Sequence, residues 1–200
     1  MTAHAKIAGI ILSGGASRRM GTPKALLRFQ NETFLDRLIR VFSAVSSPII
    51  VVVGEHAGQI QSGIERGREV LFVVNPDPER GMLSSLKCGL ALVPAGADAA
   101  MFLPVDHPQI ALETVQCIAE RFRRDRAPVT VPVHLGEHGH PVCIARPVIE
   151  ELLALPLDAK ASDVIHRHVA RTSYIGVLDQ AVVTDVDDLK AYAELLARNS

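Results

Sequence analysis

The feature that most constrains the fold of this chain is the alternation of continuously apolar segments with amphipathic ones. It predicts five strands, at residues 7–12, 48–54, 70–75, 99–106 and 129–134, and three helices, at residues 33–45, 82–93 and 112–124. Segments such as PIIVVVG and AAMFLPV are apolar at every position, as expected when helices cover both faces of a parallel sheet. The sequence therefore predicts an α/β fold with a mostly parallel sheet.

The simple alternation ends after residue 134. We expect a loop, a short strand, two helices, two apolar runs and a terminal helix, at residues 136–141, 142–145, 147–155, 161–169, 174–178, 181–183 and 187–197. Neither a repeat nor a linker divides the 200 residues, of which 48% are hydrophobic. One core of this size is typical of a single domain, so we expect residues 1–200 to form one domain with a small antiparallel extension.

Charge and cysteine usage exclude several classes of protein. A formal net charge of −1 gives no bulk attraction to nucleic acid or to an anionic membrane, so any phosphate must bind at a focused site. Cys88, Cys117 and Cys143 are scattered and form no C-x-x-C pair, which argues against disulfides and a zinc site. The N-terminus shows no secretion signal and no apolar run approaches about 18 residues, so a cytoplasmic protein without a membrane span is predicted.

The first predicted strand leads directly into a glycine-rich, cationic loop, LSGGASRRMGTPK at residues 12–24. Gly14 and Gly15 can turn backbone N–H groups toward an anion without a Cβ in the way, while Arg19 and Lys24 add positive charge. Two residues separate Gly21 from Lys24, so the loop is no Walker motif, and the dinucleotide fingerprint also fits poorly. We interpret it as a phosphate-binding loop, the alternative being a structural turn with solvated charges.

Two further segments end at the same edge of the predicted sheet. Asp106 follows an apolar strand, and His107-Pro108 then stops that strand and leaves the carboxylate exposed. Mg²⁺ keeps most of its waters and substrate phosphates, so a single Asp can anchor it, although a strand-end Asp can also simply cap a turn. Because ligands of such sheets bind beyond the carboxyl ends of the strands, the Gly14 loop, Asn75 and Asp106 are expected to meet in one cleft.

Asn75 begins a segment that is suited to reading a nucleobase or a ribose. A Pro-rich turn follows it and leads to a helix start that carries Ser84 and Ser85. The Asn amide both donates and accepts hydrogen bonds, and the first-turn amides favour polar ligands. The alternative is that Asn75 forms the turn and that the two serines are ordinary helix-start residues.

Several motifs together resemble the MobA-like nucleotidyltransferases, the family of the molybdenum cofactor cytidylyl- and guanylyltransferases. The loop is similar to L-x-G-G-x-S-x-R-M-G-x-x-K, residues 105–108 to G-D-x-P, residues 75–86 to N-P…G-M-x-x-S-L, residues 139–142 to G-H-P-V, and residues 183–189 to D-[IV]-D-T-x-E-D-L. The resemblance runs from about Ala8 to Leu196. It implies a Rossmann-like, three-layer α/β domain. Val105 replaces the family's Gly, a departure that bears on how closely the backbone approaches a ligand.

The resemblance also implies a reaction and a role for each residue. A Mg²⁺-dependent enzyme would transfer CMP from CTP to a phosphorylated acceptor, molybdopterin cofactor, and release pyrophosphate. The resemblance implies that Arg19, Lys24 and Asp106 are catalytic and that Asp106 also binds the metal. It implies that His140 binds the phosphate of the acceptor. The nucleotide-binding positions are Leu12, Ser13, Gly14, Gly15, Ser17, Asn75, Ser84 and Ser85. A second metal ligand falls on Thr184, Asp185 or Asp187, although the acids there also suit a helix N-terminus.

Other functions stay open at this stage. The cytidylyl branch usually reads L-A-A-G where the guanylyl branch reads L-A-G-G, and Ser13-Gly14-Gly15 is closer to the second, so GTP is an alternative. Related domains activate sugar or isoprenoid phosphates. A different class is a non-catalytic protein that holds the mature cofactor and delivers it to a molybdoenzyme partner, but intact Lys24 and Asp106 argue against that role.

Overall fold

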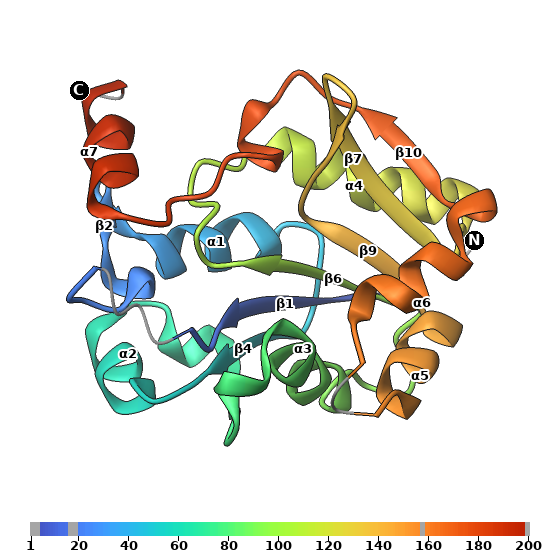
Figure 1. The fold of residues 1–200 in the computed structure, drawn as a ribbon, viewed down its shortest axis with the longest axis horizontal. Helices are drawn as coiled ribbons and strands as arrows, with labels where there is room; N and C mark the ends of the chain where they lie inside the picture. Colours follow the sequence, from blue (N-terminus) through green and yellow to red (C-terminus); the bar gives the residue numbers. More distant parts are fainter. Residues whose placement is uncertain (1–4, 16–19, 157–158, 199–200) are drawn as a thin grey trace.

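The computed structural model describes residues 5–15, 20–156 and 159–198. Its main sheet has the strand order β10-β7-β9-β6-β1-β4-β5, with β8 paired to β7 beside this path (Figure 1). The strands of this sheet are β1 (Ile7–Ser13), β4 (Ile49–Val53), β5 (Val70–Val74), β6 (Ala99–Pro104), β7 (Val129–His134), β8 (Glu137–His138), β9 (Val142–Ala145) and β10 (Ser173–Gly176). A separate antiparallel pair consists of β2 (Arg28–Phe29) and β3 (Glu32–Thr33).

Most strands of the main sheet run in one direction. β1 is parallel to β4 and β6, β5 is parallel to β4, and β10 is parallel to β7. β9 is antiparallel to both β6 and β7, and β8 is antiparallel to β7. The predicted α/β fold, a mostly parallel sheet with a small antiparallel part, is confirmed.

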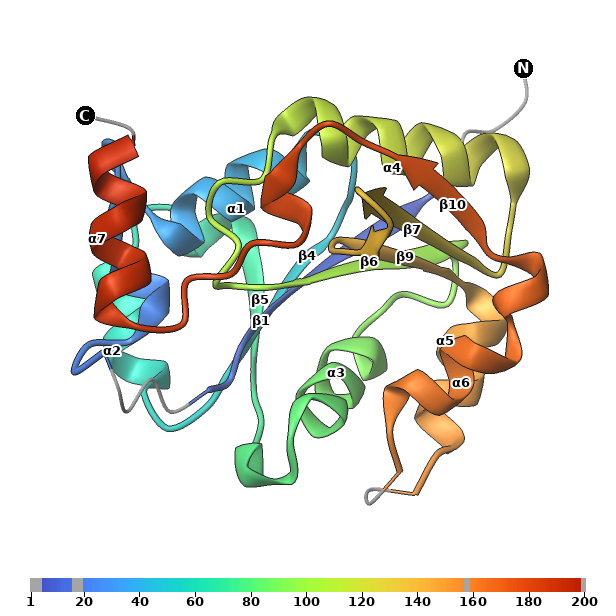
Figure 2. The ribbon, with the colours of Figure 1, turned by 45° about the horizontal axis from the view of Figure 1, so that its top comes forward.

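Helices cover both faces of the sheet and bury a core on each (Figure 2). One face is covered by α1 (Phe34–Ser43) and α4 (Leu112–Asp125), and the other by α3 (Met82–Ala91), α5 (Arg146–Ala154) and α6 (Ala161–Arg167). Two further helices are α2 (Ala57–Gly63) and α7 (Leu189–Arg198). Short 3₁₀ turns are η1 (Lys24–Leu26), η2 (Gly67–Glu69), η3 (Pro78–Arg80), η4 (Val169–Arg171) and η5 (Gln180–Val182).

Local sequence explains how these layers pack. All five residues of β4 are buried, because helices lie on both of its faces. Gly89 lets α3 approach the sheet closely, since a Cβ there would lie 2.7 Å from Ile10 Cγ2. On the opposite face, Thr33 caps α1 by accepting a hydrogen bond from the backbone N–H of Asp36.

The strand register brings the chemically interesting segments to one edge. Leu12 pairs with Pro104 and Ser13 pairs with Val53, so β1, β4 and β6 end side by side. The backbone N–H of Val105 donates to the Leu12 carbonyl at 3.0 Å, and that of Asn75 donates to the Val53 carbonyl at 2.8 Å. The predicted meeting of the Gly14 loop, Asn75 and Asp106 at one edge agrees with this register.

Some elements differ from the sequence-based expectation. Helix α2 and the β2–β3 pair were not anticipated, because Ala57–Gly63 has two glycines and each strand of the pair has two residues. The apolar run at 181–183 lies largely in η5 rather than in a longer element. The terminal helix begins at Leu189, which leaves Asp187 in the preceding loop.

Candidate functional site

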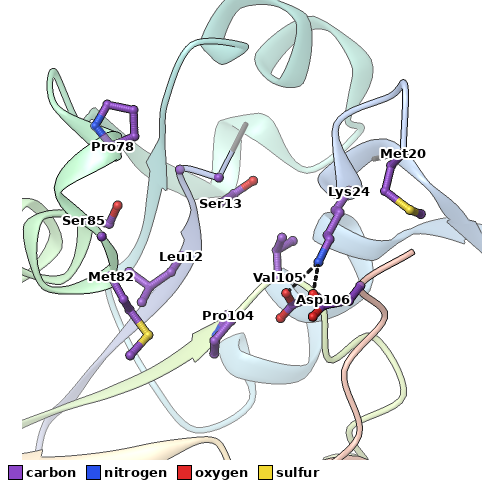
Figure 3. A pocket seen from close by; sticks show the side chains of 14 residues that line it. Leu12, Ser13, Met20, Lys24, Pro78, Met82, Ser85, Pro104, Val105 and Asp106 are labelled. Atoms are coloured by element: carbon purple, nitrogen blue, oxygen red, sulfur yellow. Dashed lines mark hydrogen bonds and ion pairs between the residues drawn. The ribbon is translucent and has the colours of Figure 1, made fainter. Parts of the chain in front are cut away.

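A pocket of about 500 Å³ opens at the carboxyl ends of β1 and β6. It is lined by Leu12, Ser13, Gly14, Gly15, Met20, Lys24, Pro78, Gly81, Met82, Ser85, Pro104, Val105, Asp106 and Asp187. Figure 3 shows Lys24 and Asp106 on one side of the opening and Ser13, Pro78 and Ser85 on the other, with Met82 beside Leu12. The pocket thus has a charged side and a side of backbone, hydroxyl and apolar groups.

Lys24 is held between two carboxylates on the charged side. Its Nζ donates to Asp106 Oδ2 at 2.9 Å and to Asp187 Oδ1 at 2.6 Å. Burial alone would lower the pKa of the Lys24 ammonium, but hydrogen bonds and charge from Asp187 and Asp106 outweigh burial and raise that pKa above its ordinary 10.5. Lys24 is therefore a fixed positive charge at neutral pH.

Distant parts of the chain supply these three side chains. Lys24 opens η1, which follows Pro23, and Asp106 follows the end of β6. Asp187 lies just before α7, and the backbone N–H of its neighbour Val186 donates to the Asp106 carbonyl at 2.8 Å. That backbone bond ties the two acidic segments together directly.

Residues 179–187, which we call the C-terminal strap, cross the edge of the sheet near β6. The Ala181 carbonyl lies 3.0 Å from Nδ1 of buried His107, and the Val182 carbonyl accepts from the backbone N–H of His140 at 2.8 Å. A carbonyl oxygen only accepts, so His107 carries its proton on Nδ1. Gly139 permits the close approach, because a Cβ there would lie 2.4 Å from the Val182 carbonyl oxygen.

The strap is also fixed at its beginning. The Asp179 carboxylate accepts from the backbone N–H of Ala111 at 3.0 Å and from the hydroxyl of Thr114 at 2.7 Å. Ala111 immediately precedes α4, so Asp179 caps that helix from a remote part of the sequence. Its other oxygen accepts from the backbone N–H of Ala181 at 3.0 Å.

Across the pocket, Asn75 organises the two serines of α3. Its Nδ2 donates to Ser84 Oγ at 2.8 Å and to Ser85 Oγ at 2.9 Å, while its Oδ1 accepts from the backbone N–H of Asp77. The Ser84 hydroxyl lies within 2.8 Å of the Gly81 carbonyl. Ser85 lines the pocket, whereas Asn75 and Ser84 are buried outside its lining.

The glycine loop packs tightly against this group. A Cβ on Gly14 would lie 2.7 Å from Ser85 Oγ, and a Cβ on Gly54 would lie 2.5 Å from the Gly14 carbonyl oxygen. Glycine at both positions lets the loop sit between the end of β4 and the start of α3. Gly15, by contrast, is exposed with open space around it.

His140 is not part of the pocket lining and lies beside His107, the neighbour of Asp106. Its ring centroid is 5.4 Å from that of His107, whose Nε2 lies 3.9 Å from Asp106 Oδ1. Burial and neighbouring His107 lower the pKa of His140 to about 4, although Asp106 acts in the opposite direction. The His140 imidazole is therefore neutral at neutral pH and offers a hydrogen bond instead of a charge.

The carboxylate pair suits a divalent cation that needs few protein ligands. Asp106 and Asp187 direct oxygens at the same ammonium, so the two oxygens converge on one point. Across the ranges that the structure describes, no three His, Cys, Asp or Glu side chains form a metal-binding group. Mg²⁺ and Mn²⁺ prefer oxygen ligands, and two carboxylates together with substrate oxygens and water would supply them. A closed structural metal site would need more protein ligands.

The structure brings together many of the residues that the sequence singled out. Those lining the pocket are Leu12, Ser13, Gly14, Gly15, Lys24, Ser85 and Asp106. Ser17 and Arg19 lie outside the described residues. Of the three alternatives for a second metal ligand, Asp187 lines the pocket. Asp185 is exposed and outside the lining, and the Thr184 hydroxyl donates to the Gln180 carbonyl within the strap.

Sequence reasoning did not single out every residue of the site. Met20, Pro78, Gly81, Met82, Pro104 and Val105 also line the pocket. Most of them lie within the quoted motifs, so their position next to a predicted ligand was the available signal. The bond between His107 and the strap had no local signal, because its two partners are 74 positions apart.

A mostly parallel sheet between helices, with a glycine loop and a Lys–carboxylate cluster at the strand ends, is typical of proteins that bind nucleotides through their phosphates. The chain belongs to the family of the MobA-like NTP transferase domain, whose model matches residues 9–172. It is 30% identical over 148 residues to the molybdenum cofactor cytidylyltransferase of Escherichia coli, covering 74% of each protein. It is also 30% identical over 162 residues to a probable molybdenum cofactor guanylyltransferase of Bacillus anthracis, covering 78% of this chain and 77% of the relative.

Solved structures show the same fold over nearly the whole chain. The crystal structure of Rv0371c from Mycobacterium tuberculosis superposes with a TM-score of 0.85 at 29% identity, covering 98% of this chain and 100% of that one. A complex of the same protein with manganese gives a TM-score of 0.80 at 26% identity, covering 96% and 99% of the two chains. This chain is thus a nucleotidyltransferase of the MobA-like type. None of the helices in the described ranges is long and apolar enough to span a membrane.

Proposed function

We propose that this protein transfers CMP from CTP to molybdopterin cofactor and releases pyrophosphate. The observation that carries the proposal is the Lys24 ammonium between Asp106 and Asp187 at a pocket that also contains the Gly14-Gly15 loop. Nucleotidyl transfer needs positive charge at the α-phosphorus, a divalent cation and a rigid hold on the triphosphate. The name of the Escherichia coli relative, a molybdenum cofactor cytidylyltransferase, supports the choice of CTP and of the acceptor.

The two sides of the pocket suggest how the nucleotide lies. We assign the base and the ribose to Ser13, Gly14 and Ser85, and the triphosphate to the side that carries Lys24. Asn75 acts by holding Ser84 and Ser85, since its own amide is engaged by them and by Asp77. The predicted contacts of Ser17 and Arg19 with the triphosphate remain predictions.

Asp106 and Asp187 are the residues that would hold the divalent cation. The manganese complex of the Mycobacterium tuberculosis relative supports a divalent cation, and we expect Mg²⁺ to serve in this chain. The bound cation would supply neutralisation of phosphate charge. Lys24 then stabilises the negative charge that develops on the transferred phosphoryl oxygens, as a compact ammonium does well.

We place the acceptor beyond Asp106, on the side of His140. The neutral His140 ring packs against Phe102 and His107, with ring centroids 6.1 and 5.4 Å apart. A neutral imidazole would orient the acceptor phosphate through a hydrogen bond without adding charge. The strap holds this residue in place, because the Val182 carbonyl accepts from the backbone N–H of His140 at 2.8 Å.

GTP is the second candidate donor, and the glycine at position 14 favours it. The sequence has Gly at position 14, as the guanylyl branch does, and the space for a Cβ there is occupied by Ser85 Oγ at 2.7 Å. The Bacillus anthracis relative, a probable guanylyltransferase, is as similar to the chain as the cytidylyl relative. The nucleotide assay below therefore compares CTP with GTP as the donor.

The test measures pyrophosphate release by purified protein with Mg²⁺, molybdopterin cofactor and each of CTP, GTP, ATP and UTP. We expect CTP to be consumed and a molybdopterin dinucleotide to form. Asp106→Asn should lower the rate by about 10²–10³-fold, because a group that organises transition-state charge is lost. Asp98→Asn is the matched control, since Asp98 precedes β6 at the opposite end of that strand.

The outcomes separate the candidates. GTP consumption in place of CTP would assign the protein to the guanylyl branch. Consumption of no nucleotide with this acceptor would make the acceptor assignment wrong, and sugar or isoprenoid phosphates would be tried next. Full activity of Asp106→Asn would contradict the assigned mechanism and leave the fold assignment intact.

A further inference from the structure

The Lys24 ammonium occupies the position that a divalent cation would take between the two acids. Its Nζ lies 2.9 Å from Asp106 Oδ2 and 2.6 Å from Asp187 Oδ1, and 14% of the Lys24 side chain is exposed. Mg²⁺ binds carboxylate oxygen at about 2.0–2.1 Å. A cation that bridges the same two oxygens would therefore overlap the ammonium, and the two cannot be present together.

The charges of the cluster also favour replacement of the Lys24 ammonium by a divalent cation. In the arrangement of Figure 3, one ammonium faces two carboxylates. These three side chains of the described residues together carry one net negative charge, which opposes the approach of a triphosphate. Replacing the ammonium by a divalent cation neutralises both carboxylates. Lys24 then has its full positive charge to offer to phosphate oxygens on the same side of the pocket.

We propose that Lys24 and the divalent cation exchange places when the metal–nucleotide complex binds. Without ligand, Lys24 keeps Asp106 and Asp187 together; with ligand, the carboxylates take the cation and Lys24 moves to the phosphates. This inference rests on the proposed function for the identity of the nucleotide, but its central step concerns the cation alone. Each component alone binds weakly, and each strengthens binding of the other by the same factor, as linkage requires.

The decisive experiment titrates Mn²⁺ alone, without nucleotide or acceptor, into the purified protein. Lys24→Met removes the competing charge, so we expect it to bind Mn²⁺ about tenfold or more tightly than wild type. In a separate titration with CTP present, CTP should raise the Mn²⁺ affinity of the variant far less than that of wild type. Lys6→Met is the matched control with the same charge change, since exposed Lys6 precedes β1 at its far end from the pocket.

Unchanged or weaker Mn²⁺ binding by Lys24→Met would overturn the exchange. The Mn²⁺ titration contains no nucleotide, so its result does not depend on the transfer assay. If Lys24→Met binds Mn²⁺ more tightly but the wild-type protein transfers no nucleotide, the exchange is upheld and the proposed function fails. If the wild-type protein transfers CMP but Lys24→Met binds Mn²⁺ no more tightly than wild type, the proposed function stands and the exchange is wrong.

A second measurement uses the wild-type protein and avoids any loss of folding in the variant. Acylation of Lys24 by an amine-reactive reagent, followed by mass spectrometry, should become faster when Mn²⁺ is added, because the carboxylates release the amine. Acylation of Lys6 should not change. Equal Lys24 rates with and without saturating Mn²⁺ would contradict the proposal.

Discussion

At the scale of single residues, His140 makes stability depend on pH. Burial and His107 hold its pKa at about 4, below the ordinary 6.5. The unfolded chain therefore takes up a proton near pH 6.5 that the folded protein accepts only near pH 4. Stability from this group is complete above pH 6.5 and is lost as the pH falls toward 4, by roughly 2 kcal/mol at pH 4.5.

Urea denaturation at pH 7 and pH 4.5 measures this contribution. We expect His140→Asn to lose less free energy of unfolding between the two pH values than wild type does. His138→Asn serves as the control, because His138 is an exposed residue stacked on Tyr174. Identical losses in wild type and His140→Asn would show that this imidazole is not held neutral by folding.

Gly14 and Ser85 give a second prediction at this scale. Alanine at position 14 would place its Cβ 2.7 Å from Ser85 Oγ, which would have to rotate and lose its buried hydrogen bond from Asn75. Gly14→Ala should therefore lower the free energy of unfolding by about 1–3 kcal/mol.

The contact predicts strong coupling between the two positions. In a Ser85→Ala background the nearest atom would be the residue 85 Cβ at 3.7 Å, an ordinary contact, so Gly14→Ala should cost clearly less there. Thermal or urea unfolding of the two single variants and the double variant checks this. If the losses in free energy of unfolding of the two single variants add up to that of the double variant, the loop moves as a unit and Ser85 does not restrict position 14.

At the scale of elements, the C-terminal strap joins α4, the G-H-P-V turn and α7 around Asp106. Asp179 caps α4 through Ala111 and Thr114, and Tyr192 of α7 donates to the Arg28 carbonyl at 2.8 Å. Asp187 lies between these two attachments. Its position therefore depends on the strap as a whole.

Asp179→Ala should lower the free energy of unfolding by about 1–2 kcal/mol, the usual cost of losing a helix cap. It should also weaken Mn²⁺ binding, because the strap that positions Asp187 loses one anchor. Asp185→Ala, at an exposed strap position, is the control for the removal of a nearby charge. A variant that is destabilised but binds Mn²⁺ normally would show that Asp179 supports α4 without positioning the acid.

At the scale of the whole molecule, the architecture was largely predictable from sequence and the site was predictable in part. Continuously apolar strands identified the parallel sheet, since only burial on both faces selects such segments. The glycine loop and Asp106 could be predicted as site residues because each directly follows an apolar strand. Asp187 could not be chosen over Asp185 or Thr184, because the choice depends on the Val186 N–H reaching the Asp106 carbonyl across the fold.

The engagement of Asn75 was unpredictable for the same reason. Its residue type suits ligand recognition and turn formation equally, and only the packed position of α3 shows that its amide holds Ser84 and Ser85. Short-range patterns thus predict which groups reach the edge of the sheet. They do not predict which of those groups are already engaged by one another.

The Lys24–Asp187 pair spans 163 positions, and this separation has a consequence for synthesis. A ribosome-bound chain that has emerged as far as β10 carries the glycine loop, Lys24 and Asp106, but not the second carboxylate. Until the strap has been made and laid across the sheet edge, Lys24 has one acidic partner of the pair. The pocket is thus completed only after the sheet that supports it has been synthesised.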